Sequence, residues 1–197
     1  MLINGKPDVI YLLIEDDEFP LKHEKIKVIN VSGQQWFAYA PNTETRYTYM
    51  TLMRLALCKY LKEARALSID PDCIVDGDIS ELWNLDIKDY YCAGGREPDK
   101  SWDGIYVNGG VILFNLKKLK ADGKADEMIE ELNKKPYGFP DQDVLNIFCK
   151  GKILEFDPKF NCHTWSIPVD KPVIVHYAGM QHWAHLPLCE KYEKMEV

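Results

Sequence analysis

Short apolar runs that alternate with helix-like segments are the feature that most constrains the fold of this chain. The run Val9–Glu15 (VIYLLIE) is rich in branched and aromatic residues, which is typical of a strand covered on both faces, as in a parallel sheet. Similar runs predict strands over Ile26–Val31, Arg65–Ile69, Tyr90–Ala93, Val111–Leu116, Ile153–Phe156 and Val173–Tyr177. Helices are predicted over Thr45–Leu61, Asp122–Asn133 and Asp141–Lys150. Strands that alternate with helices indicate a layered α/β fold.

Length, charge and cysteine content narrow the class of protein. The 197 residues fit one globular domain, since domains usually hold about 100–150 residues. The net charge of −7 argues against a nucleic-acid binder, because binding a polyanion requires clustered Lys and Arg. Six scattered cysteines without a CxxC pair indicate small buried residues in a reducing cytoplasm. Without an apolar run of roughly 20 residues or a secretory leader, we expect a cytoplasmic protein with no transmembrane segment.

An acidic turn follows the predicted strand that ends at Ile69. Asp70 and Asp72 stand two residues apart, and at the carboxyl end of a strand both carboxylates can reach one hard cation such as Mg²⁺ or Mn²⁺. The alternative is a solvated Asp-Pro-Asp turn, which is common in proteins. His176, at the end of the strand Val173–Tyr177, also has two interpretations, a satisfied core histidine or a metal ligand. The residues by themselves leave these alternatives open.

Four segments resemble the motifs of glycosyltransferase family 8, in the order of that family. Ala66–Trp83 resembles the DxD region, and the other three are Tyr106–Leu116 (fNxGvlllNL), Asp141–Asn146 (DQDxLN) and Val175–Gly179 (HyxG). The resemblance implies a GT-A fold, a nucleotide-diphospho-sugar transferase fold with a mixed, mostly parallel sheet flanked by helices. It implies a single domain over residues 1–197 with a catalytic core at about 45–183. It also implies sugar transfer from a nucleotide sugar, usually a UDP-hexose, with retention of configuration and usually with Mn²⁺.

The resemblance assigns metal binding to three residues. Asp70 and Asp72 match the two aspartates of the DxD motif, and His176 matches the third protein ligand of the family. Two carboxylates and an imidazole suit Mn²⁺, which accepts both oxygen and nitrogen donors, and Mg²⁺ is the alternative ion. We therefore expect the imidazole of His176 to lie within coordinating reach of both aspartates.

Further residues match positions that contact the donor in the family. Asn108, Gly109 and Gly110 match the loop that contacts the donor sugar. Glycine suits such a loop, because it lets the backbone approach a ligand closely. A turn that enters the strand at Val111 is an alternative explanation of the two glycines, and both explanations can hold at once.

Two predicted catalytic residues come from the third motif. Asp141 matches the carboxylate that accepts hydrogen bonds from sugar hydroxyls, and it is also a candidate helix cap. Gln142 matches the residue that lies near the anomeric carbon, and Arg54 matches a helix arginine near the donor sugar and diphosphate. Without the resemblance, Arg54 would be interpreted as a solvated helix residue. Glutamine is a poor nucleophile, so attack by the acceptor on the leaving-group face is as plausible as a covalent intermediate.

The chain departs from the family pattern near its start. Leu2-Ile3 followed by Asn4-Gly5-Lys6-Pro7 resembles the end of a helix, so we expect the family's first strand, nucleobase loop and most of its first helix to be absent. Alternatively, the first four residues are a simple tail, or Val9–Glu15 with Asp16–Phe19 replaces the missing strand and acidic loop. A shortened sheet would leave an exposed edge, through which two copies of the chain can pair as a homo-oligomer.

The last motif departs as well. Family members often continue as GxxKPW, with the lysine on the diphosphate, whereas this chain has Gly179-Met-Gln-His182-Trp183. We expect His182 to supply a weaker, pH-dependent cation in place of that lysine.

The function predicted from these residues is Mn²⁺-dependent transfer of a hexose from UDP-glucose or UDP-galactose to a saccharide or other hydroxyl acceptor. The first alternative is a non-catalytic module that binds nucleotide sugars or glycans, because the nucleobase-binding element is expected to be missing. A nucleotidyltransferase is disfavoured, since the sequence has no basic, glycine-rich phosphate loop near its first strand.

Overall fold

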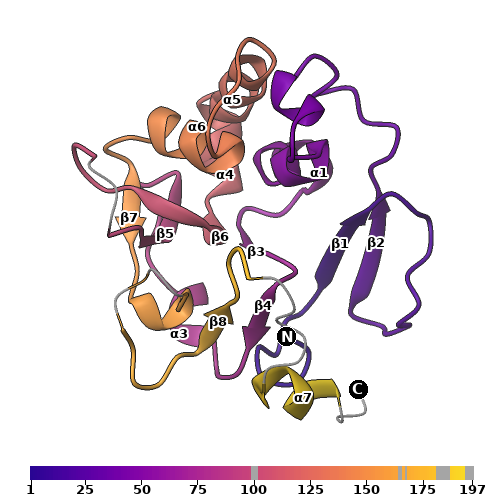
Figure 1. Ribbon diagram of the computed structural model, residues 1–197, viewed down its shortest axis with the longest axis vertical. Coiled ribbons are helices and arrows are strands. Elements are labelled where there is room, and N and C mark those ends of the chain that lie inside the picture. Colours follow the sequence, from indigo (N-terminus) through magenta and orange to yellow (C-terminus); the bar gives the residue numbers. More distant parts are fainter. Residues whose placement is uncertain (99–101, 164–165, 167, 181–186, 194–197) are drawn as a thin grey trace. The chain divides into compact units, whose positions relative to one another are not determined.

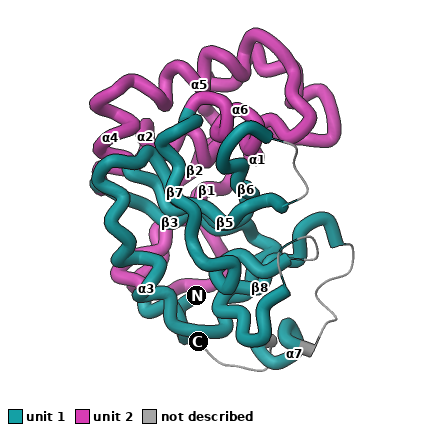
Figure 2. Tube along the Cα trace, turned by 90° about the vertical axis from the view of Figure 1, so that its left-hand side faces the viewer, with its two compact units in different colours: residues 1–6, 64–115, 149–197 teal, residues 7–63, 116–148 magenta. Residues whose placement is uncertain are grey.

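The structure is a computed structural model that describes residues 1–98, 102–163, 166, 168–180 and 187–193 (Figure 1). The chain divides into two compact units (Figure 2). Unit 1 contains Met1–Lys6, Ala64–Asn115 and Cys149–Val197, and unit 2 contains Pro7–Glu63 and Leu116–Phe148. The single domain expected over residues 1–197 stays a prediction.

Unit 1 is built on a four-stranded mixed sheet with the order β3-β6-β5-β7. The strands are β3 (Ala66–Ile69), β5 (Cys92–Arg96), β6 (Val107–Phe114) and β7 (Ile153–Glu155). All eight residues of β6 are buried, as expected for a strand with a neighbour on each side. Strands β3 and β5 run antiparallel to β6, whereas β7 runs parallel to β5.

A second pairing in unit 1 joins β4 (Cys73–Val75) to β8 (Ile174–His176) in antiparallel register, with Cys73 opposite His176. Short helices α3 (Ser80–Trp83), η3 (Pro158–Phe160) and α7 (Pro187–Glu193) belong to the same unit. The apolar core of unit 1 contains Val75, Ile79, Leu82, Ile87, Ala93, Val111, Leu113, Phe156, Phe160 and Ile174. Strands β4, β6 and β8 therefore share one core, and this fixes the backbone on which the site residues lie.

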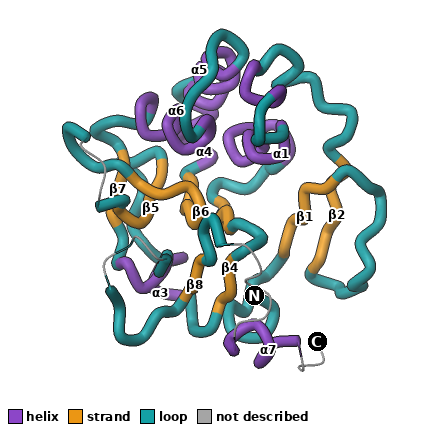
Figure 3. Tube along the Cα trace, in the orientation of Figure 1, coloured by secondary structure: helices purple, strands orange, loops and turns teal. Residues whose placement is uncertain are grey.

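Unit 2 combines a two-stranded parallel sheet with helices (Figure 3). The strands are β1 (Ile10–Ile14) and β2 (Ile26–Asn30). The helices are η1 (Pro41–Glu44), α1 (Tyr49–Leu52), η2 (Met53–Ala56), α2 (Leu57–Tyr60), α4 (Leu116–Ala121), α5 (Lys124–Leu132) and α6 (Pro140–Phe148). Helix α6 packs against α5, α1 and η2, and this places its first turn beside Arg54.

The structure confirms the α/β fold with a mixed sheet, but it corrects the expectation that most strand pairs are parallel. In the part of the chain that the structure describes, β1-β2 and β5-β7 are parallel pairs, but β3-β6, β5-β6 and β4-β8 are antiparallel, so the pairing is not mostly parallel. Apolar runs report burial and carry no information on strand direction. The short sequence separation between the end of β5 at Arg96 and the start of β6 at Val107 favours antiparallel neighbours, because a parallel pair needs a longer crossover.

Three local expectations are also corrected. Residues Ile10–Ile14 are half-buried, because β2 is the one strand paired with β1 among the described residues. The helix expected over Thr45–Leu61 begins at Tyr49 and passes through a 3₁₀ segment at η2. Asn108–Gly110 lie inside β6, so the glycines do not form a turn before Val111.

Among the described residues, no helix has both the length and the apolar character of a membrane span.

Candidate functional site

The two aspartates lie in the turn between β3 and β4 and are held by the backbone. The Asp70 N–H donates to the carbonyl of Gly110 (2.8 Å), which continues the ladder between β3 and β6. The carbonyl of Asp72 accepts from the Tyr177 N–H (2.9 Å), which continues the pairing of β4 with β8. Both carboxylates are partly exposed, at 26% for Asp70 and 29% for Asp72. The turn is therefore fixed while its carboxylates stay accessible.

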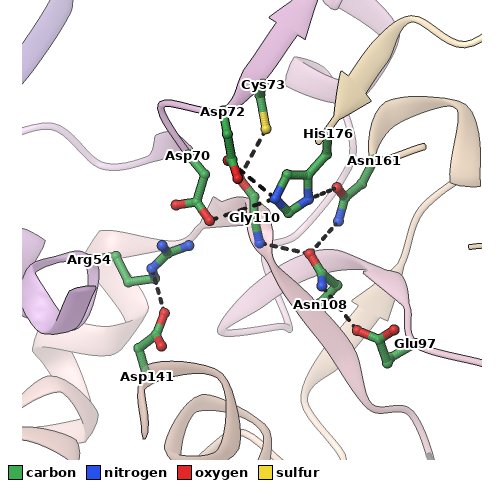
Figure 4. A network of polar contacts seen from close by, with 10 residues as sticks. All are labelled: Arg54, Asp70, Asp72, Cys73, Glu97, Asn108, Gly110, Asp141, Asn161 and His176. Atoms are coloured by element: carbon green, nitrogen blue, oxygen red, sulfur yellow. Dashed lines mark hydrogen bonds and ion pairs between the residues drawn. The ribbon is translucent and has the colours of Figure 1, made fainter. Parts of the chain in front are cut away.

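His176 closes β8 and directs its ring at the two carboxylates (Figure 4). Its Nε2 lies 3.4 Å from Asp72 Oδ1 and 3.9 Å from Asp70 Oδ2, although the side chain is only 4% exposed. The cross-strand pair of Cys73 and His176 brings these residues together, since opposite residues of an antiparallel ladder have neighbouring side chains. The structure thus brings together the three predicted metal ligands.

Gly110 provides the surface on which the imidazole of His176 rests. A methyl group at residue 110 would overlap the His176 ring atoms Cε1 and Nδ1. Because β6 and β8 belong to different sheets, only a residue without a side chain lets the ring lie this close to the β6 backbone. The glycine of the second motif is therefore explained by contact with the metal-ligand candidate.

A chain of buried amides continues from His176. His176 Nδ1 is 2.9 Å from Asn161 Oδ1, and Asn161 Nδ2 donates to Asn108 Oδ1 at 3.0 Å. Asn108 Oδ1 also accepts from the Gly110 N–H at 2.9 Å, and Asn108 Nδ2 donates to Glu97 Oε2 at 3.0 Å. Asn161 is 2% exposed and Asn108 8%. These polar groups satisfy one another, as buried polar groups must.

Cys73 adds a sulfur ligand candidate at the same place. One donor atom each from Asp72, Cys73 and His176 lie within 4.8 Å of one another. The thiol also contacts the carbonyl of Gly110, at a sulfur to oxygen distance of 3.9 Å. The sequence predicts six small buried cysteines. Cys92, Cys149 and Cys189 are buried, whereas Cys58, Cys162 and Cys73, which lies beside the acidic turn (Figure 4), are half-buried.

The donor set fits a divalent cation. Ligand atoms about 2.1 Å from one ion in octahedral geometry are about 3 Å apart when adjacent. The separations of 3.4 and 3.9 Å between His176 Nε2 and the carboxylate oxygens are slightly wider, so a small side-chain movement would bring the imidazole and either carboxylate to one ion. The three donor atoms that lie within 4.8 Å of one another belong to Asp72, Cys73 and His176. Oxygen and imidazole donors together suit Mn²⁺, and oxygen donors alone would suit Mg²⁺.

A second histidine lies behind the first. The rings of His163 and His176 are in edge-to-face contact, with centroids 5.8 Å apart. Burial lowers the pKa of His163, Glu97 opposes that effect, and the nearby His176 lowers the pKa further. The lowered pKa disfavours a positive charge on the His163 ring beside His176.

Three residues that are predicted to contact the donor lie in unit 2, namely Arg54 and the third-motif residues Asp141 and Gln142. Arg54 Nε and Asp141 Oδ2 form an ion pair at 2.7 Å, and both side chains are nearly buried, at 11% and 8% exposed (Figure 4). Asp141 lies in the first turn of α6, where the helix dipole favours a carboxylate. Gln142 follows it and is buried, and its carbonyl accepts from Asn146 Nδ2 at 2.8 Å. Asp141 is therefore held at the start of α6 by its ion pair with Arg54.

Several functional candidates lay outside the sequence prediction, and one predicted residue lies outside the described structure. His182 belongs to residues 181–186, which are not described. Asn161, Glu97 and Cys73 were not predicted as site residues. Cys73 directly follows the DxD motif, and that position was the available signal; Asn161 has no such neighbour in the sequence.

Comparison with known proteins gives consistent results. The family model described as glycosyl transferase family 8 matches residues 17–186. The lipopolysaccharide 1,3-galactosyltransferase of Salmonella typhimurium is 30% identical over 188 residues, which are 77% of this chain and 55% of that protein. Glycosyltransferase GlyE of Streptococcus pneumoniae is 26% identical over 162 residues, 74% of this chain and 39% of that protein.

Solved structures show the same fold. An active-site variant of LgtC superposes with a TM-score of 0.69 at 20% identity, covering 86% of this chain and 74% of that one. GlyE superposes with a TM-score of 0.60 at 24% identity, covering 73% and 43%. This chain spans about half of the length of the curated relatives it matches, or less.

Proposed function

We propose, from the premise that this chain belongs to glycosyltransferase family 8, that it transfers a hexose from a nucleotide sugar to a hydroxyl acceptor with retention of configuration. The observation that carries the proposal is the approach of His176 Nε2 to within 3.4 and 3.9 Å of the carboxylates of Asp72 and Asp70. In this proposal the three side chains hold Mn²⁺, with Mg²⁺ as the alternative ion.

Charge development explains why the reaction needs this cluster. Breaking the bond between sugar and phosphate leaves negative charge on the diphosphate and positive character on the sugar ring. A divalent cation, when bound, stabilises that leaving group as a Lewis acid. Asp70 and Asp72 supply the negative charge that retains such a cation, and the buried ring of His176 adds an imidazole nitrogen at a fixed position.

The residues of unit 2 have separate roles in the proposal. Asp141 accepts hydrogen bonds from the sugar hydroxyls, Gln142 lies near the anomeric carbon, and Arg54 contributes fixed positive charge for the donor. The ion pair of Arg54 with Asp141 supports these roles, because it holds both side chains in one orientation before a ligand arrives. His182 completes the set as a cation for the diphosphate.

The names of relatives support a proposed donor and acceptor. The names of two relatives specify a lipopolysaccharide glucosyltransferase and a lipopolysaccharide galactosyltransferase. The galactosyltransferase LgtC, a structural neighbour, has been solved in complex with donor and acceptor sugar analogues. We therefore propose UDP-glucose or UDP-galactose as the donor and a saccharide as the acceptor.

The test compares donor turnover in the wild-type chain and two matched variants. Wild-type protein is incubated with each UDP-hexose and Mn²⁺, and released UDP is measured with and without a saccharide acceptor. Asp72→Asn is expected to lose at least about 100-fold in rate, because a Lewis acid contributes several kcal/mol and each 1.36 kcal/mol is tenfold. Asp76→Asn, which removes the same charge outside the cluster, is the control. Full activity in Asp72→Asn or in the presence of a chelator would refute the metal role.

Lack of turnover with every donor, together with Mn²⁺ and UDP binding by calorimetry, would instead identify the non-catalytic alternative. The two outcomes differ in the measured quantity, so one set of protein preparations separates them.

A further inference from the structure

We propose that Asn161, held by Asn108, is the positioning residue that makes His176 a metal ligand through Nε2. This inference rests on the proposed metal role of His176 and goes beyond it, because it assigns the proton of the imidazole. The carbonyl oxygen of Asn161 accepts the hydrogen of Nδ1, so the lone pair of Nε2 faces Asp70 and Asp72 (Figure 4).

The assignment starts from a group whose role is fixed. The backbone N–H of Gly110 can only donate, so the atom of Asn108 that lies 2.9 Å from it must be the carbonyl oxygen. The amide nitrogen of Asn108 then faces Glu97 Oε2 at 3.0 Å, where a carboxylate accepts its hydrogen. A donor therefore fixes the oxygen end of the Asn108 amide, and an acceptor fixes its nitrogen end.

The orientation passes from Asn108 to Asn161. The carbonyl oxygen of Asn108 also faces Asn161 at 3.0 Å, so the atom of Asn161 at that contact must be the donating Nδ2. The remaining amide atom of Asn161 is its oxygen, which lies 2.9 Å from His176 Nδ1. An oxygen acceptor at that distance requires a hydrogen on Nδ1, and so the neutral ring carries its lone pair on Nε2.

Burial makes the assignment costly to break. Asn161, Asn108 and His176 are 2%, 8% and 5% exposed, so water cannot replace a lost partner easily. A flipped Asn161 amide would place two carbonyl oxygens or two donors face to face in a buried position. The network therefore couples the backbone of β6 to the protonation pattern of a ring on β8.

This network also changes the interpretation of the second motif. The hydrogen bonds of Asn108 in the structure run to Gly110, Asn161 and Glu97, and Gly110 supports the His176 ring. Asn108 and Gly110 of this motif therefore help to hold the His176 ring in position. Direct contact of Asn108 with the donor sugar stays a prediction.

The first experiment measures Mn²⁺ affinity by calorimetry in three variants. Asn161→Leu removes the acceptor at nearly constant volume and is expected to weaken Mn²⁺ binding about 10–100-fold, as is usual when a histidine ligand loses its outer partner. Asn161→Asp keeps an oxygen acceptor for Nδ1 and is expected to lose less affinity than Asn161→Leu. Asn42→Leu removes a buried asparagine of unit 2 and is expected to leave the affinity unchanged. Equal affinity of wild type and Asn161→Leu would overturn the proposal.

The second experiment reads the proton directly. Protein labelled with ¹⁵N in its histidine rings is loaded with Cd²⁺, a diamagnetic probe, and the His176 signals are identified by their loss in His176→Gln. We expect a hydrogen on Nδ1 and cadmium on Nε2. Cadmium on Nδ1, or a hydrogen on Nε2, would overturn the proposal even if Asn161→Leu fails to fold.

The two experiments separate this inference from the proposed function. Neither uses a sugar donor, so an inactive chain with the expected ring protonation would refute transferase activity and retain the positioning role. An active chain with the opposite ring protonation would retain the activity and refute the positioning role.

Discussion

The missing side chain of Gly110 shows how one residue can determine a ligand site. The His176 ring occupies the space into which a β-carbon at position 110 would project. Gly110→Ala is expected to displace the ring, to lower the free energy of unfolding by about 1–3 kcal/mol through overpacking, and to weaken Mn²⁺ binding. Calorimetry and denaturant unfolding check both effects. Gly33→Ala, at a position with open space, is the matched control, and wild-type Mn²⁺ affinity in Gly110→Ala would contradict the expectation.

Cys73 predicts the metal preference of the cluster. A cysteine sulfur beside a carboxylate and an imidazole favours soft or borderline cations, so we expect Cd²⁺ to bind more tightly than Mn²⁺. Cys73→Ser should weaken Cd²⁺ binding and leave Mn²⁺ binding nearly unchanged, as competition calorimetry would show. Cys58→Ser, which removes a half-buried thiol of unit 2, provides the comparison. Unchanged Cd²⁺ affinity in Cys73→Ser would exclude the sulfur from the cluster.

Part of this site could be predicted from the sequence, and the reason differs for each residue. The motifs and their order in the sequence identify Asp70, Asp72 and His176, so these residues could be expected to lie close together. Asn161 could not, because its importance comes from the bridge between Cys162 and Val175, which places it beside His176. The glycines could be recognised as special, but the contact that requires Gly110 is made by a strand more than 60 residues away.

At the scale of elements, a polar clasp connects the chain start, the end of β4 and helix α7. Asn4 Nδ2 donates to the Val75 carbonyl (2.9 Å) and to the Tyr192 hydroxyl (2.6 Å). Asp76 accepts from the Tyr192 hydroxyl and forms an ion pair with Lys191 at 2.7 Å. Helix α7 is therefore tied to the strand that carries Cys73.

The clasp predicts a pH-dependent stability. Burial raises the pKa of Asp76, but hydrogen bonds from Lys191 and Tyr192 lower it, and the net direction is below its ordinary value. The contribution of Asp76 is therefore present above pH about 4 and is lost as the pH falls through the lower pKa of the folded protein. Asp76→Asn should cost about 1 kcal/mol of unfolding free energy at pH 7, and less below pH 4. Exposed Asp89→Asn is the control, and a cost that stays constant with pH would contradict this assignment.

The strands and helices show where sequence patterns stop being informative. The apolar run Val111–Leu116 located β6, but the strand begins at Val107, which pairs with Arg96 of β5, and residues 107–110 are all buried, which no local pattern reveals. The segment Thr45–Leu61 has helical spacing, yet it changes to 3₁₀ geometry at η2, where Met53, Leu55 and Ala56 are all buried. Tertiary packing determines where each element begins and ends, whereas the spacing of apolar residues predicts whether it is a strand or a helix.

At the scale of the whole molecule, the candidate ligands come from segments that are far apart in the sequence. Asp70 and Asp72 precede β4, and His176 ends β8, so one cation would connect segments separated by about 100 residues. A ligand that binds the folded chain and not the unfolded chain stabilises the fold in proportion to the logarithm of its concentration. Metal binding should therefore be visible as global stability as well as local affinity.

This linkage gives a prediction for thermal unfolding. At a Mn²⁺ concentration of about 100 times its dissociation constant, the folded chain gains about 2.7 kcal/mol, which corresponds to a rise in Tm of about 5–11 °C for a chain of this size. Asp72→Asn should show no such rise, because it removes a charged ligand. Asp76→Asn has the same change in net charge and keeps the cluster, so its lower Tm should still increase with Mn²⁺. An equal rise in both variants would mean that the cation binds elsewhere on this acidic chain.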